Sequence, residues 1–352
     1  MKLEYKPDFE EAKKYWRAYW AGEIIDRPLI AIKAPKGDKR PKGLRGLNGL
    51  EDFRLATQQY DEAAATIHWL GEAIPFIQPN FGPDQFAAWL GADLQYNPDA
   101  GDTSWSVPVI QDWDVDGLEI GYPHGVWWER MLEFQRIAAE IGDGKFLVGV
   151  PDIHSNMDAL SALRGPEALC FDFLDVPEKI DRAITAICQA FRIAIEGIEK
   201  AGRQIERGYI GWLPFYSEER FVVLQCDFAC MVGPEHFRRW ILPALIEESE
   251  YVENAVYHYD GPGALVHLKD ILSIPRIKVI QWTPGAGNPP LIEWMDLLLE
   301  CQKAGKGLYL AATPDEVKIF HRNLRPEGVM YDVWVSSKEE GEALIDWLKA
   351  NI

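Results

Sequence analysis

The feature that most constrains the fold is an alternation of short apolar runs and amphipathic stretches along the second half of the chain. Apolar runs of strand length occur at residues 146–150, 209–212, 222–225, 255–258, 277–281, 307–310 and 329–333, and another lies at 74–78. Stretches with helical spacing of apolar residues separate them, at 124–140, 177–201, 234–251, 263–272, 291–304, 314–321 and 338–350. Strands that alternate with helices in this way are typical of a parallel sheet covered by helices.

Eight such strands predict an α/β protein with a closed (β/α)8 barrel, expected over residues 71–352. A doubly wound open sheet is the alternative, but no Gly-x-Gly-x-x-Gly segment follows any of the strands. Residues 1–70 are expected to form an N-terminal helical extension, with helices at 8–22 and 51–70 and a β-like run at 29–32. The stretch 96–113, rich in Pro, Gly, Asp and Trp, is predicted to be a loop-rich insertion or short hairpin.

Charge and composition narrow the range of partners. The 352-residue chain has a formal net charge of -19, so nucleic acid and anionic membrane surfaces would repel it and a small-molecule substrate is the expected partner. No uninterrupted apolar run approaches the length of a membrane span, and the first residues lack an apolar signal segment. The five scattered cysteines fit reduced thiols, so we expect a cytoplasmic protein.

Polar residues follow most of the predicted strands, at the edge of a parallel sheet where active sites form. Two pairs have i, i+2 spacing, which puts both side chains of an extended segment on one side: Asp152 with His154, and His258 with Asp260. The full set of strand-end candidates comprises Asn80, Asp152, His154, Tyr216, Asp227, His258, Asp260, Trp282, Thr313 and Asp332. Acids and imidazoles gathered at one mouth suit either a divalent metal ion or general acid–base chemistry.

Structural roles compete with these functional ones. Asp227 is about as well explained as a buried carboxylate that accepts loop amide hydrogen bonds, and Asp332 as the cap of the last helix. Tryptophan is abundant, with 14 residues, and several stand near Gly, Pro or Asp, where they could wall a ligand pocket or plug the ends of a large core. The predicted substrate-binding residues are Asn80, Phe81, Trp105, Tyr216 and Trp282.

Three groups of segments form a further pattern: residues 163–165 (LRG) with 171–180 (FDFLDVPEKI), Asp227 followed by 232–237 (VGPEHF) and 242–243 (LP), and 258–261 (HYDG). Together these segments resemble the uroporphyrinogen decarboxylase superfamily. Their order covers roughly residues 145–335. The resemblance implies a (β/α)8 barrel and one of two chemistries, which are decarboxylation of porphyrinogen acetates without a cofactor and zinc-dependent methyl transfer between a corrinoid protein and a thiol.

The chain departs from both branches of that superfamily. The decarboxylases have an Arg-rich amino-terminal segment that holds substrate carboxylates, whereas the corresponding region here has only Asp26-Arg27-Pro28. The methyltransferases have His-x-Cys and a later Cys as zinc ligands, whereas this chain has Asp260 and Asp332 at those places. The resemblance therefore implies a harder ligand set, with His258, Asp260 and Asp332 or Cys226 holding zinc or another divalent ion.

The favoured interpretation is a methyltransferase-like enzyme with Asp152, His154, Asp227 and His258 as catalytic residues. It implies methylcobalamin carried by a corrinoid partner protein, and a homodimer is expected. The alternatives are a decarboxylase of the uroporphyrinogen type, or a barrel that processes a small organic acid or sugar without corrinoid.

Overall fold

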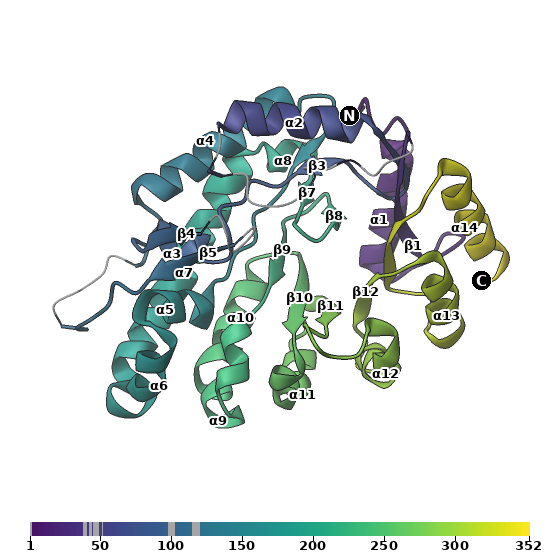
Figure 1. The fold of residues 1–352 in the computed structure, drawn as a ribbon. Coiled ribbons are helices and arrows are strands. Elements are labelled where there is room, and N and C mark those ends of the chain that lie inside the picture. The colour runs from purple at the N-terminus through teal and green to yellow at the C-terminus, as the bar shows by residue number, and fades with distance from the viewer. Residues whose placement is uncertain are drawn as a thin grey trace.

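The computed structural model describes residues 2–37, 41, 44, 49–50, 52–97, 103–114 and 120–352. Within them the chain forms a mixed α/β structure with a mostly parallel central sheet and many helices (Figure 1). The predicted α/β class is therefore confirmed, and a TIM-barrel-like arrangement is consistent with it. None of the helices in the described residues is both long enough and apolar enough to cross a membrane.

The elements follow one another along the chain in the expected alternation. The strands are β1 Leu29–Pro35, β2 Ile67–Gly71, β3 Phe76–Ile77, β4 Asp93–Tyr96, β5 Ser104–Val107, β6 Leu147–Val148, β7 Tyr209–Ile210, β8 Tyr216–Ser217, β9 Phe221–Leu224, β10 Asn254–Asp260, β11 Ile277–Thr283, β12 Gly307–Ala311 and β13 Val329–Trp334. The helices are α1 Phe9–Ala21, α2 Phe53–Ala65, α3 Gln85–Trp89, α4 Gly125–Ile141, α5 Asn156–Arg164, α6 Pro166–Asp175, α7 Pro177–Ala201, α8 Gln204–Arg207, α9 Pro234–His236, α10 Leu242–Glu250, α11 Leu268–Leu272, α12 Met295–Lys303, α13 Pro314–Asn323 and α14 Lys338–Ala350.

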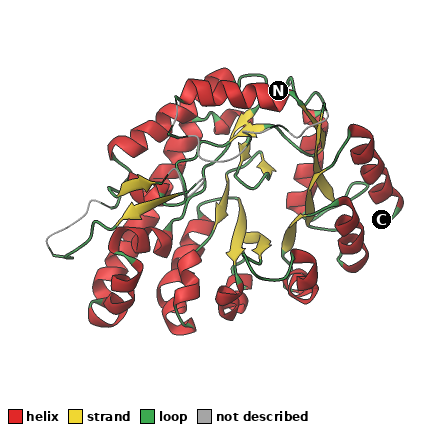
Figure 2. Ribbon diagram, viewed as in Figure 1, coloured by secondary structure: helices red, strands yellow, loops and turns green. Residues whose placement is uncertain are grey.

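The main sheet has seven strands in the order β2-β1-β13-β12-β11-β10-β9, and all its pairs are parallel except β1 with β2. A short parallel pair, β3 with β6, lies beside it, and Val150 bridges in parallel to Gly211 just after β7. In Figure 2 the helices lie around the outside and the strands toward the inside. All but the last residue of β1 and of β13 are buried, as expected for strands covered on both faces.

The predicted helices and strands of the second half agree closely with the structure. The helix predicted at 177–201 is α7, and those at 291–304 and 338–350 correspond to a 3-10 turn with α12 and to α14. The region predicted as one helix at 234–251 contains α9, a π-helical segment at Phe237–Ile241 and α10. The predicted loop-rich insertion at 96–113 contains β5, whose hairpin partner β4 begins three residues earlier at Asp93, and its residues 98–102 lie outside the described part.

One prediction about the amino-terminal region is wrong. The helix expected at 51–70 ends at Ala65, and residues Ile67–Gly71 form strand β2, antiparallel to β1. The β-branched Thr66 and Ile67 favour an extended backbone, but the pairing with β1 decides the outcome because it satisfies the backbone groups there. Residues 1–70 thus contribute β1 and β2 to the main sheet, and the division at residue 70 stays a prediction.

A buried ion pair ties the end of β2 to the chain just before β1. Arg27 donates from both terminal nitrogens to the two carboxylate oxygens of Glu72, at 2.7 Å each, and the side chains are only 5% and 2% exposed. The same carboxylate accepts the backbone N–H of Ile30 at 3.0 Å. Removing one partner of such a pair leaves the other charge desolvated without compensation.

We expect Glu72→Ala to lower the free energy of unfolding by about 3–5 kcal/mol, because Arg27 would keep its burial and lose its carboxylate. The double variant Arg27→Met, Glu72→Leu should recover most of the loss. Urea unfolding followed by circular dichroism measures both, with the exposed Glu23→Ala as control. A loss of less than about 1 kcal/mol in Glu72→Ala, as for an exposed pair, would contradict a role for this ion pair in stability.

Candidate functional site

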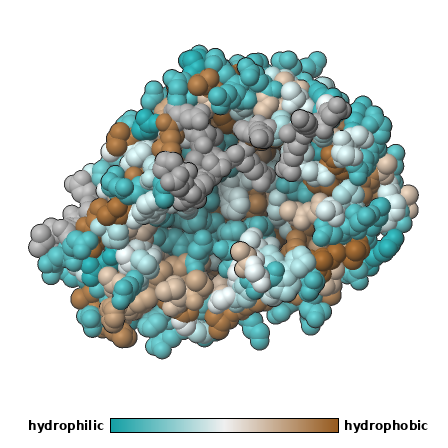
Figure 3. All heavy atoms as spheres, in the orientation of Figure 1, coloured by the Kyte–Doolittle hydropathy of each residue, from teal (hydrophilic) through white to brown (hydrophobic). Residues whose placement is uncertain are grey.

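The carboxyl ends of β6, β9 and β10 bring five of the predicted residues together. Asp152 and His154 follow β6, Asp227 begins a 3-10 turn after β9, and His258 and Asp260 end β10. We call Asp152, His154, Asp158, Asp227, His258 and Asp260 the His/Asp cluster. Figure 3 shows hydrophilic surface in the hollow at the middle of the face that looks toward the viewer.

His154 lies among three carboxylates. Its Nε2 is 3.3 Å from Asp152 Oδ2, and its Nδ1 is 3.7 Å from Asp227 Oδ2 and 3.8 Å from Asp158 Oδ2. Burial of the ring lowers the pKa of His154, but the negative charges of Asp152, Asp158 and Asp227 outweigh it and raise the pKa to about 10. The imidazole is therefore a cation at neutral pH in the metal-free protein.

Asp158 was not predicted, and it holds the loop that carries Asp227. From the first turn of α5 its two carboxylate oxygens accept the backbone N–H groups of Asp227, at 3.0 Å, and Phe228, at 2.8 Å. Burial and the negative charge of Asp227 raise the pKa of Asp158 to about 6. The role of binding loop amides, which the sequence suggested for Asp227, is performed by Asp158. Its position four residues after His154, in the first turn of α5, is the signal that could have identified it.

Two sets of three side chains have metal-ligand spacing, and both contain Asp227. One donor atom from each of His154, Asp158 and Asp227 lies within 4.8 Å of the others, and the same holds for Asp227, His258 and Asp260. Burial raises the pKa of Asp227, whereas the nearby imidazoles of His154 and His258 oppose the increase. Four carboxylates thus face two imidazoles, so the cluster has an excess of negative charge that a divalent cation would balance.

His258 is oriented by a residue of the neighbouring strand. It pairs in register with Gln281 of β11, and its Nδ1 forms a hydrogen bond with Gln281 Oε1. Gln281 Nε2 in turn donates to Thr283 Oγ1 at 2.7 Å, so Oε1 is the amide's acceptor and Nδ1 of His258 carries the proton. The lone pair of His258 is therefore on Nε2. A histidine ligand whose other nitrogen donates to a protein group is the usual arrangement in metal sites.

The other predicted residues lie outside the cluster. Asp332 forms a buried ion pair with Lys33 of β1 and accepts the hydroxyl of Tyr309 at 2.8 Å, so it belongs to neither metal-ligand set and does not cap the last helix. Ser337 caps that helix. Cys226 also belongs to neither set, and burial raises the pKa of its thiol well above the usual value. Thr313 caps α13.

The predicted substrate-binding residues are dispersed. Phe81 packs on Phe53 and Trp127, Trp282 packs on Tyr259 and Trp294, and both are buried in the core. Tyr216 packs on Phe9 of α1, Trp105 is exposed on β5, and the Asn80 side chain accepts the N–H of Gly82. The structure does not bring them together with the cluster. A cavity of about 340 Å³ does border it, between His154, Asp158 and Asp227 and the β5 region at Ser106 and Pro108.

Behind the cluster lies a buried carboxyl group that the sequence did not single out. Glu248 of α10 accepts a hydrogen bond from Asn156 Nδ2 at 3.0 Å, and the same nitrogen donates to the carbonyl of Gln225. Burial raises the pKa of Glu248 to about 8, although the hydrogen bonds from Asn156 and Ser155 oppose the increase. Asn156 has a positive φ of 44°, a conformation that Asn tolerates better than most residues. Glu248 is therefore mostly protonated at neutral pH.

This raised pKa gives a pH dependence of stability with a definite sign. Between 4.5 and about 8 the folded protein keeps a proton on Glu248 that the unfolded chain has lost, so this contribution is complete below 4.5 and is lost as the pH rises through about 8. The slope from this one group is at most about 1.4 kcal/mol per pH unit. We expect Glu248→Gln to lack this slope. Its free energy of unfolding should therefore rise relative to that of the unmodified protein as the pH increases across that interval.

Urea unfolding at several pH values within the interval and above it measures the difference. Glu250→Gln, an exposed carboxyl of the same helix, is the matched control and should leave the slope unchanged. A constant difference between Glu248→Gln and the unmodified protein over the interval would mean that Glu248 is ionised in the folded state.

Comparison with known proteins shows similarity of fold. No protein-family model matches the sequence, and none of the curated proteins matches it. Among solved structures, a methyltransferase from Methanosarcina mazei is similar over 96% of this chain and 98% of its own, with a TM-score of 0.61 and 11% sequence identity. At this identity the similarity concerns the fold alone, and it is consistent with a TIM-barrel-like α/β structure. Fold and cluster together define an α/β protein with a His/Asp site at its strand ends.

Proposed function

We propose that the protein is a methyltransferase-like enzyme whose site is the His/Asp cluster, with a divalent metal ion bound by Asp227, His258 and Asp260. The observation that carries the proposal is the convergence of these three donors from two neighbouring strand ends, within 4.8 Å of one another. The similarity in fold to a methyltransferase and the resemblance of residues 258–261 to the methyltransferase branch support the kind of reaction.

The donor set fits a metal ion. Two carboxylates and an imidazole bind zinc, and a set without thiolates also suits harder divalent ions. The hydrogen bond between His258 and Gln281 leaves Nε2 as the ligand nitrogen. The set of His154, Asp158 and Asp227 is less suited to a metal, because both carboxylate oxygens of Asp158 already accept backbone N–H groups.

The bound metal would supply Lewis acidity, lowering the pKa of a thiol or hydroxyl acceptor. The chain's own residues would handle the proton and the charge. His154 as a cation can donate a hydrogen bond to a developing negative charge, and the carboxylate of Asp152 beside it can accept the released proton. Asp158 keeps the turn of Asp227 in place through the two backbone N–H groups that it accepts.

The corrinoid part of the proposal places methylcobalamin on a partner protein. The cavity beside the cluster, at about 340 Å³, is of a size for a small substrate, and a corrinoid ring system is far larger. The cofactor would therefore sit over the strand ends while the small acceptor occupies the cavity. We also propose that the protein forms a homodimer.

We also propose that the sheet closes into a (β/α)8 barrel. The parallel pair β3–β6 and the bridge from Val150 to Gly211 after β7 provide parallel strands between the two ends of the seven-stranded sheet, at β2 and β9. Parallel strands in this gap are what closure of the sheet requires. In a closed barrel, the strand ends that carry the cluster would surround one mouth.

Metal binding can be tested by variants matched in shape. We expect Asp227→Asn, His258→Gln and Asp260→Asn each to weaken zinc binding by at least about 10-fold, because each removes one of three protein ligands. Asp332→Asn, which changes a residue paired with Lys33, should keep the metal, as should the exposed Asp296→Asn. Equilibrium dialysis with elemental analysis gives the stoichiometry. Equal zinc binding by the three variants and the unmodified protein would remove the proposed site.

Methyl transfer is tested with free methylcobalamin and a small thiol. Zinc-loaded protein should accelerate loss of the methyl group, followed by the change in the corrinoid absorption spectrum, and Asp260→Asn should slow the reaction by about 10²-fold or more. Asp296→Asn should react at the unmodified rate. If zinc binds at the cluster but the rate equals that of protein-free solution with each of several divalent ions, the metal site stands and corrinoid-dependent methyl transfer does not.

A further inference from the structure

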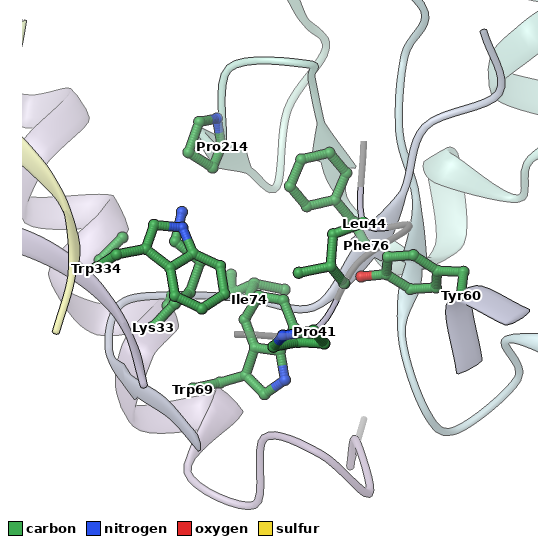
Figure 4. Close-up of a pocket in the computed structure, with 11 residues that line it drawn as sticks. Lys33, Pro41, Leu44, Tyr60, Trp69, Ile74, Phe76, Pro214 and Trp334 are labelled. Carbon is green, nitrogen blue, oxygen red and sulfur yellow. The ribbon is translucent and has the colours of Figure 1, made fainter. Parts of the chain in front are cut away.

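A second cavity lies on the opposite part of the main sheet, around β1. It has a volume of about 220 Å³ and shares no lining residue with the His/Asp cluster. Figure 4 shows its walls, with Trp334 and Tyr60 on opposite sides in this view and Ile74 between them. The lining side chains come from β1, β2, β3, β13, α2, the chain between β1 and α2, and the segments after β2 and β7: Ala31, Lys33, Pro41, Leu44, Tyr60, Trp69, Ala73, Ile74, Phe76, Pro214 and Trp334.

Four of these side chains are aromatic, and two of the four do not pack against another aromatic ring of the described residues. Among the described residues, Trp69 and Phe76 contact no other aromatic ring, whereas most large aromatic side chains of this protein pack in ring pairs. Trp69 is held in place because its indole N–H donates to the carbonyl of Ala64 at 3.1 Å. The cavity therefore has fixed aromatic walls before any ligand enters.

Small side chains leave the space open. Ala31 and Ala73, both almost fully buried, stand where a longer apolar side chain would occupy part of the volume. An apolar cavity of 150 Å³ in another protein accommodates benzene, so about 220 Å³ accommodates one aromatic ring with a small substituent.

Among the described lining residues, one is charged. Lys33 lines the cavity, is 7% exposed, and has its ammonium 5.7 Å from the centre of the Trp334 ring. Its ion-pair partner Asp332 is not among the lining residues. A ligand in the cavity therefore meets the positive side of the ion pair, so an oxygen acceptor suits this wall and a second cation does not.

From this geometry we infer that the cavity is a binding site for a one-ring aromatic compound with an oxygen-acceptor substituent directed at Lys33. The inference goes beyond the proposed function and needs neither the metal nor methyl transfer. The segment after β7 borders both places, because Pro214 lines the cavity and the Trp212 ring lies 5.2 Å from that of His258. The segment 212–214 therefore lies between the cavity and the His/Asp cluster.

The test uses benzamide as probe and isothermal titration calorimetry on the full chain. We expect saturable 1:1 binding with a Kd of about 1 mM or tighter. Benzylammonium, of similar size but with a cation in place of the oxygen acceptor, should bind at least about 10-fold more weakly. Absence of saturable benzamide binding, or equal affinity for the two probes, would overturn the inference without the need of any variant.

Variants then locate the bound ring. Ala73→Leu fills the cavity and should weaken benzamide binding at least about 10-fold, whereas Ala350→Leu, at an exposed position of α14, should leave it unchanged. Asp227→Asn should bind benzamide normally even after it has lost zinc, which separates this inference from the proposed function. Loss of benzamide binding in Asp227→Asn, or unchanged binding in a folded Ala73→Leu, would show that the ring binds elsewhere.

Discussion

The parallel alignment of β9, β10 and β11 is the constraint on which the candidate site depends. Parallel strands end at one edge of a sheet, so residues separated by more than thirty positions in the chain, such as Asp227 and Asp260, come within a few ångströms there. The same register sets His258 beside Gln281, and that neighbour fixes which imidazole nitrogen is available. A slip of one residue in β11 would direct the Gln281 side chain to the other face and remove this hydrogen bond.

The balance of buried charges differs between the region around β1 and the His/Asp cluster. Around β1 each buried charge has a partner of opposite sign, as in Arg27 with Glu72 and Lys33 with Asp332. In the His/Asp cluster carboxylates outnumber imidazoles. Their negative charges raise the pKa of His154 against the effect of burial, and burial raises the pKa values of Asp158 and Asp227. Paired charges serve stability, whereas an unbalanced group at strand ends is the kind of arrangement found at reactive sites.

Much of the fold was predictable from local pattern. The strand and helix periods of the second half are strong, and α7 and α14 were predicted with the bounds observed. The segment Ile67–Gly71 was missed because its conformation depends on pairing with β1. In the site, the pairs Asp152/His154 and His258/Asp260 were selected by their i, i+2 spacing at predicted strand ends, and the second pair also by the resemblance of residues 258–261. Asp158 and Gln281 were missed since their roles depend on partners more than twenty residues away.

The sequence by itself determined the alternating strands and helices and the positions of acids and imidazoles at strand ends, because both follow from periodicity within a few residues. Only the tertiary structure decided which of these groups meet. It placed Asp332 beside Lys33 instead of His258, and it built an aromatic cavity from Trp69, Phe76 and Trp334 in place of the dispersed Trp105, Tyr216 and Trp282. The physical reason is that strand register and packing set long-range neighbours, which no local spacing encodes.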